Sequence, residues 1–549
     1  MRHDTSGWNI QWDEARAAQW VAGGQWLNRT IADAAREAAI NEPERVTQIC
    51  GGREITAGEV WDKSTRLACA LWHRGFRAGD VLAFQTPNWH EAMFIDVAAC
   101  MLGLVVCPIV TIYRDREVEL ILSDSRAKGI FIAEQFRGFD FAAMLERLRP
   151  TLPGLQHVWT VRGKRGAQQD LQGLLADTSW LPAMLPLPLV SPDAVKLVLY
   201  TSGTTGRPKA VLHSHNSLIR ATLMCAKHWG IKPGDTTLMP SPVTHVTGFS
   251  HGLEMPFYGG TRCVLMDKWD ASEAAAIIER EQVSFTIGAT PFLQELMDVA
   301  EASGHILPSL RLFPCGGAAV APEIIYRVTR VLPNCRAFRV YGSSEAPMIT
   351  LGFCAAGQDR LAAETDGEIV DYEVRVVDLE GRALGIDQEG EICARGPSLF
   401  LGYADPLHSS EAFDADGFFH TGDIGYVTAE NAIVFTGRIK DLINRGGEKI
   451  SAKEVEDLLH ELPGVMNAAV VAMPHARLGE TVCAYVIARP GSKVTAADIT
   501  ALLDAAGVAK QKYPERIIFV DDFPKTASGK VKKDTLRADV RERLTQATA

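Results

Sequence analysis

The chain of 549 residues has no surplus of basic residues, no closely spaced cysteines and no uninterrupted hydrophobic run. Its 56 lysines and arginines are outnumbered by 67 aspartates and glutamates. The resulting net charge of −11 excludes a general nucleic-acid binder. The eleven cysteines are scattered without a Cys-x-x-Cys pair, which indicates reduced thiols rather than a disulfide framework.

The sequence also predicts neither a targeting segment nor a membrane span. The first twenty residues are polar and charged, which predicts that no signal peptide is present. The most apolar run, residues 92–112, is interrupted by Asp96, Gly103 and Pro108. We therefore expect a buried helix leading into a strand instead of a membrane span, and a cytoplasmic protein.

Strand-like and helix-like stretches alternate over most of the length, and this alternation predicts the α/β class. Residues 81–87 and 128–134 are typical of strands, and each precedes a helical stretch. The clearest domain boundary lies near residues 437–441, and a compact unit of domain size follows it. That unit is predicted to contain helices at 452–461 and 496–505, strands at 468–473, 481–488 and 516–520, and a flexible tail at 524–533.

Residues 199–209, LYTSGTTGRPK, carry four hydroxyls and two glycines within six positions. Glycines let the backbone approach a ligand, and hydroxyls with free backbone N–H groups suit phosphate oxygens. A buried strand at 195–200 and a helix from Ser217 onward are predicted to flank this loop. A P-loop would need Gly-Lys followed by Ser or Thr, whereas Lys209 follows Pro208 and precedes Ala210. The segment therefore indicates a different kind of phosphate loop.

Three further segments contain a charged side chain that is suited to ligand binding or catalysis. Glu345 stands beside Ser344 at the predicted end of a strand, where a carboxylate suits a hard cation that carries nucleotide phosphates. Asp423, in Thr-Gly-Asp, is expected after a turn and before a strand, and its carboxylate can accept two hydrogen bonds from a ribose diol. Lys530 lies on the tail, from which a compact cation can be delivered to a developing negative charge.

Residues 200–211, YTSGTTGRPKAV, resemble the phosphate loop of the acyl-adenylate-forming superfamily, which includes acyl-CoA synthetases. Four more segments resemble that superfamily's motifs in the same order: 341–345, 421–423, 437–450 and 524–530. The family usually has Thr where this chain has Ser344, and the hydroxyl is retained. Residues 87–89 and 136–141 are similar to medium-chain and cyclohexanecarboxylate-type CoA ligases.

The resemblance implies a large N-terminal adenylate-forming domain of several subdomains and a small, mobile α+β C-terminal domain. We place them at residues 1–437 and 441–549, with a hinge at 438–440. It also implies ATP, Mg²⁺ and coenzyme A as cofactors. The residues implied in binding them are Thr201, Ser202, Gly203, Thr204, Thr205, Gly206, Lys209, Gly316, Gly317, Ala318, Tyr341, Gly342, Ser343, Ser344, Asp423, Arg438, Lys440, Gly446 and Gly447.

Roles at the reacting centre follow from the same resemblance. Lys530, Thr204, Glu345 and His245 are implied in catalysis, and Glu345 and Thr204 in holding Mg²⁺. The implied acyl site consists of His245, Val246, Phe249, Ala318, Ala319 and Val320. Most of these are apolar and none carries a charge that would bind an ammonium group, which favours a plain apolar acid. His213, His215, His245 and His251 are interpreted as caps and packing residues rather than as a zinc site.

The predicted function is an ATP-dependent acid:CoA ligase that forms acyl-AMP and then acyl-CoA from a medium-chain, alicyclic or aromatic acid. Three alternatives stay open: a stand-alone adenylation enzyme that loads a carrier protein, a luciferase-type oxygenase, and a non-catalytic nucleotide-sensing homologue. A nucleic-acid ligase is disfavoured because a Lys-x-Asp-Gly motif is absent. The expected partners are a small carboxylic acid and coenzyme A, with a homodimer and a lysine acetyltransferase acting on Lys530 as further candidates.

Overall fold

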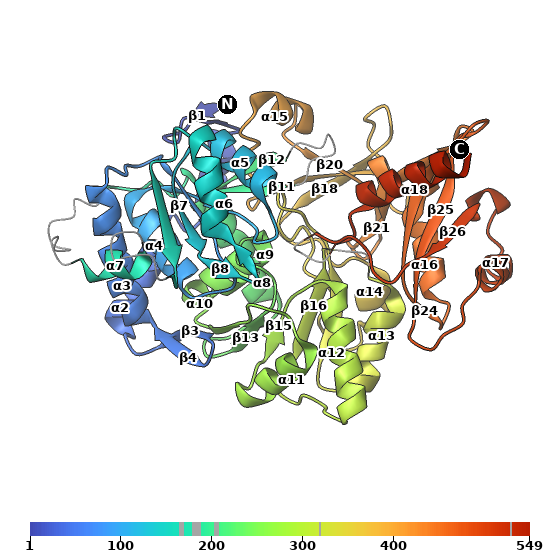
Figure 1. The fold of residues 1–549 in the computed structure, drawn as a ribbon, viewed down its shortest axis with the longest axis horizontal. Helices are drawn as coiled ribbons and strands as arrows, with labels where there is room; N and C mark the ends of the chain where they lie inside the picture. Colours follow the sequence, from blue (N-terminus) through green and yellow to red (C-terminus); the bar gives the residue numbers. More distant parts are fainter. Residues whose placement is uncertain (164–169, 178–187, 202–207, 318–319, 527–529, 549) are drawn as a thin grey trace.

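The computed structural model describes residues 1–163, 170–177, 188–201, 208–317, 320–526 and 530–548. Figure 1 shows the N-terminal half on the left, a smaller sheet above the centre and the C-terminal part on the right. Residues from Trp8 to Ile433 share one continuous hydrophobic core. The described helices include none that is long and apolar enough to cross a membrane.

The first large sheet is parallel except at one edge, in the order β10-β7-β5-β6-β11-β12. Its strands are β5 (Val81–Gln85), β6 (Val105–Pro108), β7 (Ala127–Ala133), β10 (His157–Val161), β11 (Val195–Thr201) and β12 (Lys209–Ser214). All five residues of β5 are buried, as expected of a central parallel strand covered on both faces. Strand β12 pairs antiparallel with β11, so the predicted phosphate loop connects two strands and precedes the helix by one strand.

The second large sheet has the order β17-β16-β15-β13-β14-β3-β4 and is parallel except between β3 and β4. Its strands are β3 (Val46–Cys50), β4 (Arg53–Thr56), β13 (Thr236–Met239), β14 (Arg262–Leu265), β15 (Phe285–Thr286), β16 (Leu312–Gly316) and β17 (Arg336–Val340). Because these strands run parallel, the carboxyl ends of β15, β16 and β17 meet at one edge.

Helices cover both sheets. They include α1 (Glu14–Ala22), α2 (Ile31–Asn41), α3 (Ala57–His73), α4 (Glu91–Leu102), α5 (Asp115–Asp124), α6 (Phe141–Leu148), α7 (Leu171–Ala176), α8 (His215–His228), α11 (Ala271–Arg280), α12 (Thr290–Ser303), α13 (Pro322–Val331) and α14 (Asp359–Glu364). Helix α4 is buried at all twelve positions and ends at Gly103, whose φ of +67° suits a glycine cap. This confirms that the apolar run is a core helix followed by a strand.

Helix α8 begins at a capping box, in which Ser214 and Ser217 satisfy each other's backbone N–H groups. A second, shorter helical segment consists of α9 (Val246–Gly248), a π-helix η3 (Phe249–Glu254) and α10 (Met255–Tyr258). π-helical turns are rare and occur often at functional sites. This segment follows β13 and passes beside α8.

A smaller antiparallel sheet follows the second large sheet in the chain. Its strands are β18 (Glu373–Val377), β19 (Gly390–Arg395), β20 (Phe419–Val427) and β21 (Ile433–Arg438), and α15 (Pro406–Ala412) lies in the β19–β20 connection. Asp423 was expected before a strand, but it lies inside β20, directly opposite Arg438. Gly422, with φ of +71°, allows the strand to continue through what the sequence indicates as a turn.

The C-terminal part contains a five-stranded sheet with helices on both faces. Its elements are β22 (Leu442–Arg445), β23 (Glu448–Ser451), α16 (Ala452–His460), β24 (Val465–His475), β25 (Gly479–Ala488), α17 (Ala496–Ala505), β26 (Arg516–Phe519) and α18 (Lys533–Thr548). Along β24, Val470 joins one hydrophobic cluster, whereas Ala469 and Val471 join the other. Alternate residues therefore face opposite helical layers.

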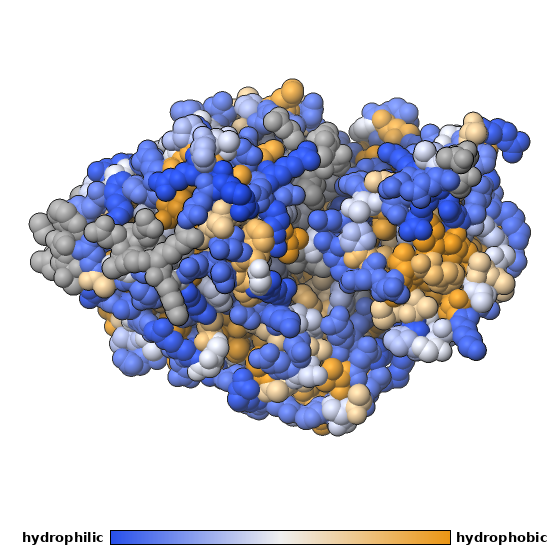
Figure 2. All heavy atoms as spheres, viewed as in Figure 1, coloured by the Kyte–Doolittle hydropathy of each residue, from blue (hydrophilic) through white to orange (hydrophobic). Residues whose placement is uncertain are grey.

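One detail of this part differs from the sequence-based expectation. The flexible tail was predicted to run to Lys533, and a helix, α18, begins there. Gly446 and Gly447 form the turn of the β22–β23 hairpin, and both have positive φ. Figure 2 shows a mainly hydrophilic face whose broadest hydrophobic area lies over this C-terminal part, where Met466 and Phe519 are exposed.

Candidate active site

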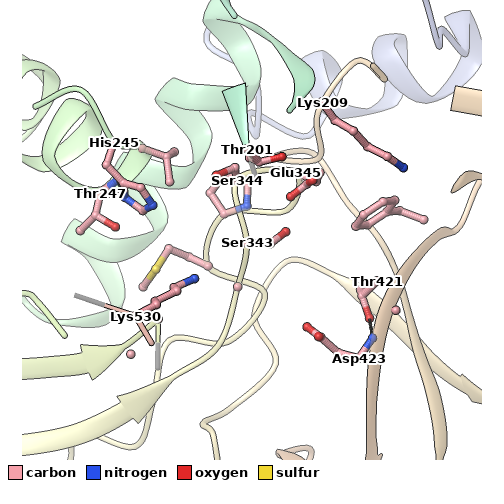
Figure 3. Close-up of a pocket in the computed structure, with 18 of the residues that line it drawn as sticks. Thr201, Lys209, His245, Thr247, Ser343, Ser344, Glu345, Thr421, Asp423 and Lys530 are labelled. Atoms are coloured by element: carbon pink, nitrogen blue, oxygen red, sulfur yellow. Dashed lines mark hydrogen bonds between the residues drawn. The ribbon is translucent and has the colours of Figure 1, made fainter. Parts of the chain in front are cut away.

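One cavity of about 660 Å³ lies at the carboxyl ends of β15, β16 and β17. Residues from both large sheets, the four-stranded sheet and the C-terminal part line it. Figure 3 shows His245 and Thr247 on one side, Thr421 and Asp423 on the other, and Thr201 and Glu345 between them. The carboxyl edge of an open α/β sheet is where ligands usually bind, so this cavity is the candidate active site.

The phosphate-loop side of the cavity is formed by the ends of β11 and β12. Thr201 and Lys209 line the cavity, and their Cα atoms pair across the two strands. The ammonium of Lys209 lies 4.8 Å from the ring centre of Tyr403, whose hydroxyl donates a hydrogen bond to Oε1 of Glu345 at 2.9 Å. The tyrosine therefore holds the carboxylate and the lysine near each other.

A buried histidine supports the turn that carries Glu345. The ring of His213, on β12, donates from Nε2 to the backbone oxygen of Ser344 at 2.7 Å, and its Nδ1 lies 3.1 Å from Oγ of Ser217. Burial lowers the pKa of His213 to about 4, so the ring is neutral near pH 7. The neutral ring can donate one hydrogen bond and accept the other, which fixes the turn against the phosphate-loop hairpin.

The opposite side of the cavity carries an acidic group paired with a basic one. Oδ1 of Asp423 lies 3.0 Å from Nε of Arg438, and Oδ2 accepts a hydrogen bond from the hydroxyl of Tyr341 at 2.8 Å. Asp423 is only 7% exposed, and its negative charge raises the pKa of Arg438. Each carboxylate oxygen keeps a lone pair for a ligand hydroxyl group.

Lys530 reaches the cavity from the C-terminal part. Its side chain lines the cavity beside Gly317, where a Cβ atom would lie 3.5 Å from Cε of the lysine. Burial lowers the pKa of Lys530 to about 8, with further lowering by Arg438 and Lys440, which Asp423 and Glu345 oppose. The side chain of Lys530 is thus mainly protonated at neutral pH, and it lies among both positively and negatively charged groups.

The remaining wall of the cavity comes from the α9–η3 segment. His245 caps α9, and its Nδ1 accepts from the backbone N–H of Thr247 at 3.4 Å. Burial and the nearby charge of Lys530 lower the pKa of His245 to about 4. Beyond it, Val246, Ser250 and His251 line the cavity, so this wall combines apolar and polar side chains.

Glu391, Cys393 and His420 form the group of possible metal ligands found among the described residues. Nδ1 of His420 lies 2.9 Å from a carboxylate oxygen of Glu391 and 3.5 Å from Sγ of Cys393. Glu391 also accepts from the backbone N–H of Gly422 at 3.1 Å. These groups satisfy one another, and together they support the start of the segment that carries Asp423. The four histidines interpreted as caps and packing residues lie outside this group.

The structure brings most of the described candidate residues into the one cavity. Lining it are Thr201, Lys209, His245, Val246, Gly316, Gly317, Gly342, Ser343, Ser344, Glu345, Asp423, Arg438, Lys440 and Lys530. Tyr341 contacts it through Asp423, whereas Phe249, Val320, Gly446 and Gly447 are not among the lining residues. Ser202, Gly203, Thr204, Thr205, Gly206, Ala318 and Ala319 lie outside the described residues.

Several lining or supporting residues were not found by sequence reasoning. Tyr403 supports Glu345 from a distant position, and Ser241, Ser250 and His251 line the cavity. A local sequence pattern did not single out Tyr403, because its partner lies 58 residues earlier in the chain. His251 had been noted only as a packing residue, although it also contributes to the cavity wall.

Comparisons with known proteins agree with this geometry. Residues 35–404 match the family described as AMP-binding enzyme, and residues 454–530 match its C-terminal domain. The chain is 32% identical to the medium-chain fatty-acid–CoA ligase of Escherichia coli K12, covering 98% of this chain and 95% of the relative. It is 31% identical to the 2-hydroxy-7-methoxy-5-methyl-1-naphthoate–CoA ligase of Streptomyces carzinostaticus, over 96% of both chains.

A solved structure of similar fold is ATP-bound MatB from Rhodopseudomonas palustris, with a TM-score of 0.81 and 27% identity over 93% of this chain and 99% of that one. The comparison confirms the predicted α/β fold, with a large adenylate-forming part and a small C-terminal part. The chain thus belongs to the AMP-binding enzyme family and is an AMP-forming acid–thiol ligase.

Proposed function

We propose that this enzyme is an ATP-dependent acid:CoA ligase, which forms acyl-AMP from ATP and a carboxylic acid and then transfers the acyl group to coenzyme A. The single observation that carries the proposal is the position of Lys530. It lies in one cavity with Asp423 and Arg438 on the nucleotide side and with His245 on the acyl side. A cation at that point suits the junction of acid and nucleotide.

The first half-reaction joins a carboxylate oxygen to the α-phosphorus of ATP and releases pyrophosphate. We assign the ribose to Asp423, because its oxygens face the cavity and are held in place by Tyr341 and Arg438. Lys530 then stabilises the negative charge that develops between the carboxylate and the α-phosphate. Lys209 is placed to neutralise phosphate oxygens at the other side of the cavity.

Glu345 fits a divalent cation. Its carboxylate lines the cavity near Thr201, and Tyr403 holds one of its oxygens while further lone pairs remain. A hard cation such as Mg²⁺ prefers such oxygen ligands and would neutralise charge on the nucleotide phosphates. Thr204, the second predicted ligand, lies outside the described residues.

The second half-reaction requires attack by the thiol of coenzyme A on the acyl carbon, with AMP as the leaving group. We propose that the C-terminal part moves about residues 438–440 between the two half-reactions, and that residues 1–437 and 441–549 act as its two bodies. Arg438 and Lys440 line the cavity at this connection. Gly446 and Gly447 lie in a hairpin turn away from the cavity, so a thiol channel along them would need that movement.

The acid is proposed to be mainly apolar, of medium length or with an alicyclic or aromatic ring. Val246, Ile287 and Ala289 line the cavity and favour such a group, because each buried CH₂ contributes about 0.8 kcal/mol. The two CoA-ligase relatives act, by name, on a fatty acid and on a naphthoate. Acetate would fill little of the cavity and is expected to be a poor substrate.

A panel of carboxylates assayed for pyrophosphate release, with and without coenzyme A, tests the proposal. We expect turnover that depends on coenzyme A and yields an acyl-CoA product. Acyl-AMP formation that stops after a single turnover and is not stimulated by coenzyme A would favour the carrier-loading alternative. Nucleotide binding without pyrophosphate release from any acid would favour the nucleotide-sensing alternative. An oxidised product would favour a luciferase-type oxygenase.

A further inference from the structure

A fully buried ionic cluster lies directly behind the acyl side of the cavity. Lys196, on β11, is 1% exposed, and its ammonium lies 3.5 Å from Oδ2 of Asp96 on α4. It also forms an ion pair with Glu254, the last residue of η3, and both carboxylates are 0% exposed. The cluster therefore joins α4, the strand that leads into the phosphate loop, and the segment that forms the acyl wall.

The composition of this cluster is unusual for a protein core. Lysine, aspartate and glutamate are rarely buried completely, and burying a charge is costly unless it is paired. One ammonium faces two carboxylates, so a single cation is shared between two anions. Oε2 of Glu254 has no hydrogen-bond partner among the described residues. Glu254 thus depends on Lys196 for its stabilisation.

The π-helical geometry explains how this cluster affects the cavity. Phe249 and Glu254 are five residues apart, and a π-helix places residues at that spacing on the same side. Both contact Lys196, whose ammonium lies 5.1 Å from the ring centre of Phe249. Ser250 and His251 instead line the cavity. This is why Phe249, predicted as an acyl-site residue, is not found in the cavity wall.

We propose that Glu254, through its ion pair with Lys196, is a positioning residue that fixes the rotation of the acyl wall and so determines affinity for the carboxylic acid. Losing this pair frees η3 to rotate, which moves Ser250 and His251 relative to the cavity. The effect on acid binding rests on the proposed function, whereas the effect on the wall itself does not. The contacts that hold Asp423 come from Tyr341 and Arg438, outside η3, so we expect nucleotide binding to stay unchanged.

The cluster supplies a matched pair of variants. Glu254→Gln and Asp96→Asn each remove one carboxylate and leave the other paired one-to-one with Lys196, so the two variants change the charge of the cluster equally. Only Glu254 belongs to η3, since Asp96 lies within α4. We expect Glu254→Gln to raise the KM for the acid by about fivefold, with the KM for ATP unchanged, and Asp96→Asn to leave both near wild type.

Protonation gives a second readout. Burial raises the pKa of Glu254 to about 6, and the nearby Lys196 opposes that shift. The pair is therefore intact above pH 6 and weakened below it, so the KM for the acid should rise below pH 6 in wild type and not in Glu254→Gln. The other titratable groups facing the cluster are Asp96 and Cys100 on α4, Lys196 on β11, His215 on α8 and Tyr258 on α10.

Hydrogen–deuterium exchange of residues 245–254 tests the wall without assuming any activity. Faster exchange there in Glu254→Gln, and not in Asp96→Asn, supports the proposal even where no acid in the panel is a substrate. Acid KM values are measured by acid-dependent exchange of pyrophosphate into ATP. The proposal is overturned if Glu254→Gln keeps the wild-type rate of hydrogen–deuterium exchange and the wild-type KM for the acid. It is also overturned if Asp96→Asn changes these two quantities as much as Glu254→Gln does, or if the KM for ATP rises together with the KM for the acid.

Discussion

The hydroxyl of Tyr341 donates a hydrogen bond to Oδ2 of Asp423 at 2.8 Å, across 82 residues of sequence. Arg438 holds the other oxygen of the same carboxylate at 3.0 Å. Burial and the charge of Asp423 raise the pKa of Tyr341, so the phenol stays protonated and remains a donor. The two contacts orient the carboxylate toward the cavity before any nucleotide arrives.

The first prediction concerns this orientation. Asp423→Asn should raise the KM for ATP by about 10- to 100-fold, because hydrogen bonds to a charged group contribute roughly 1.5–3 kcal/mol. Tyr341→Phe keeps the carboxylate and should cause a smaller rise in the same constant. Steady-state kinetics at saturating acid measure both. An Asp423→Asn enzyme with a wild-type KM for ATP would contradict the assignment of Asp423 to the ribose of ATP.

The second prediction separates the two half-reactions. Lys530→Ala should slow acyl-AMP formation by about 10²–10³-fold, the usual effect of losing one preorganised donor at a developing charge. Thioester formation from supplied acyl-AMP should be much less affected, because we propose that the C-terminal part has moved before that step. Single-turnover assays of each half-reaction provide the measurement. Equal losses in both would show that Lys530 has no special role in adenylation.

The pH dependence of adenylation follows from the lowered pKa of Lys530, about 8. The lysine is charged below that value and loses its proton above it, so the rate of adenylation should fall as the pH rises through 8. Lys530→Arg keeps its charge at every pH used and should be slower at neutral pH but lack this alkaline decline. A wild-type rate that stays constant to pH 9.5 would contradict the prediction.

A further prediction concerns Glu345. Glu345→Gln removes the charge that would hold a divalent cation, so the Mg²⁺ concentration for half-maximal adenylation should rise by about tenfold, with little change in the KM for the acid. Tyr403→Phe is the matched control, because it removes only the hydrogen bond to Oε1 of Glu345. Its Mg²⁺ requirement should shift less. Identical Mg²⁺ curves for wild type and Glu345→Gln would refute the assignment.

Local patterns predicted much of the fold. Helix α17 occupies residues 496–505 as expected, and its capping box of Thr495 and Asp498 marks its start. Strand β11 agrees with the buried run from Val195. Helix α18 was missed because it is mostly polar, and among its described residues only Leu536 and Val540 are deeply buried. A weak apolar stripe gives little signal for a helix in the sequence.

The site was predictable where the chemistry is local and less so where it depends on distant partners. Lys209, Glu345, Asp423 and Lys530 were found from motifs, and the structure gathers all four in one cavity. The position of Phe249 could not be predicted in this way, because its ring packs in the core and faces a lysine 53 residues earlier. Pairing between charges far apart in sequence is set by the tertiary fold.

The last prediction concerns acetylation of Lys530, which the sequence placed in an exposed tail. The structure shows the lysine partly buried in the cavity beside Gly317, so a modifying enzyme could reach it only after the C-terminal part moves away. Acetylation removes the charge that we assign to adenylation and adds bulk where Cε already lies 3.5 Å from the position of a Cβ on Gly317.

Acetyl-lysine installed at position 530 should therefore abolish adenylation about as completely as Lys530→Ala does, while thioester formation from supplied acyl-AMP continues. Bound ATP and acid should also protect Lys530 from a chemical acetylating reagent, because they favour the conformation in which the lysine lies inside the cavity. Peptide mass spectrometry of residues 526–532 measures that protection, with the exposed Lys493 as an internal reference. Adenylation that survives acetylation would reject both the switch and the assignment of Lys530 to that step.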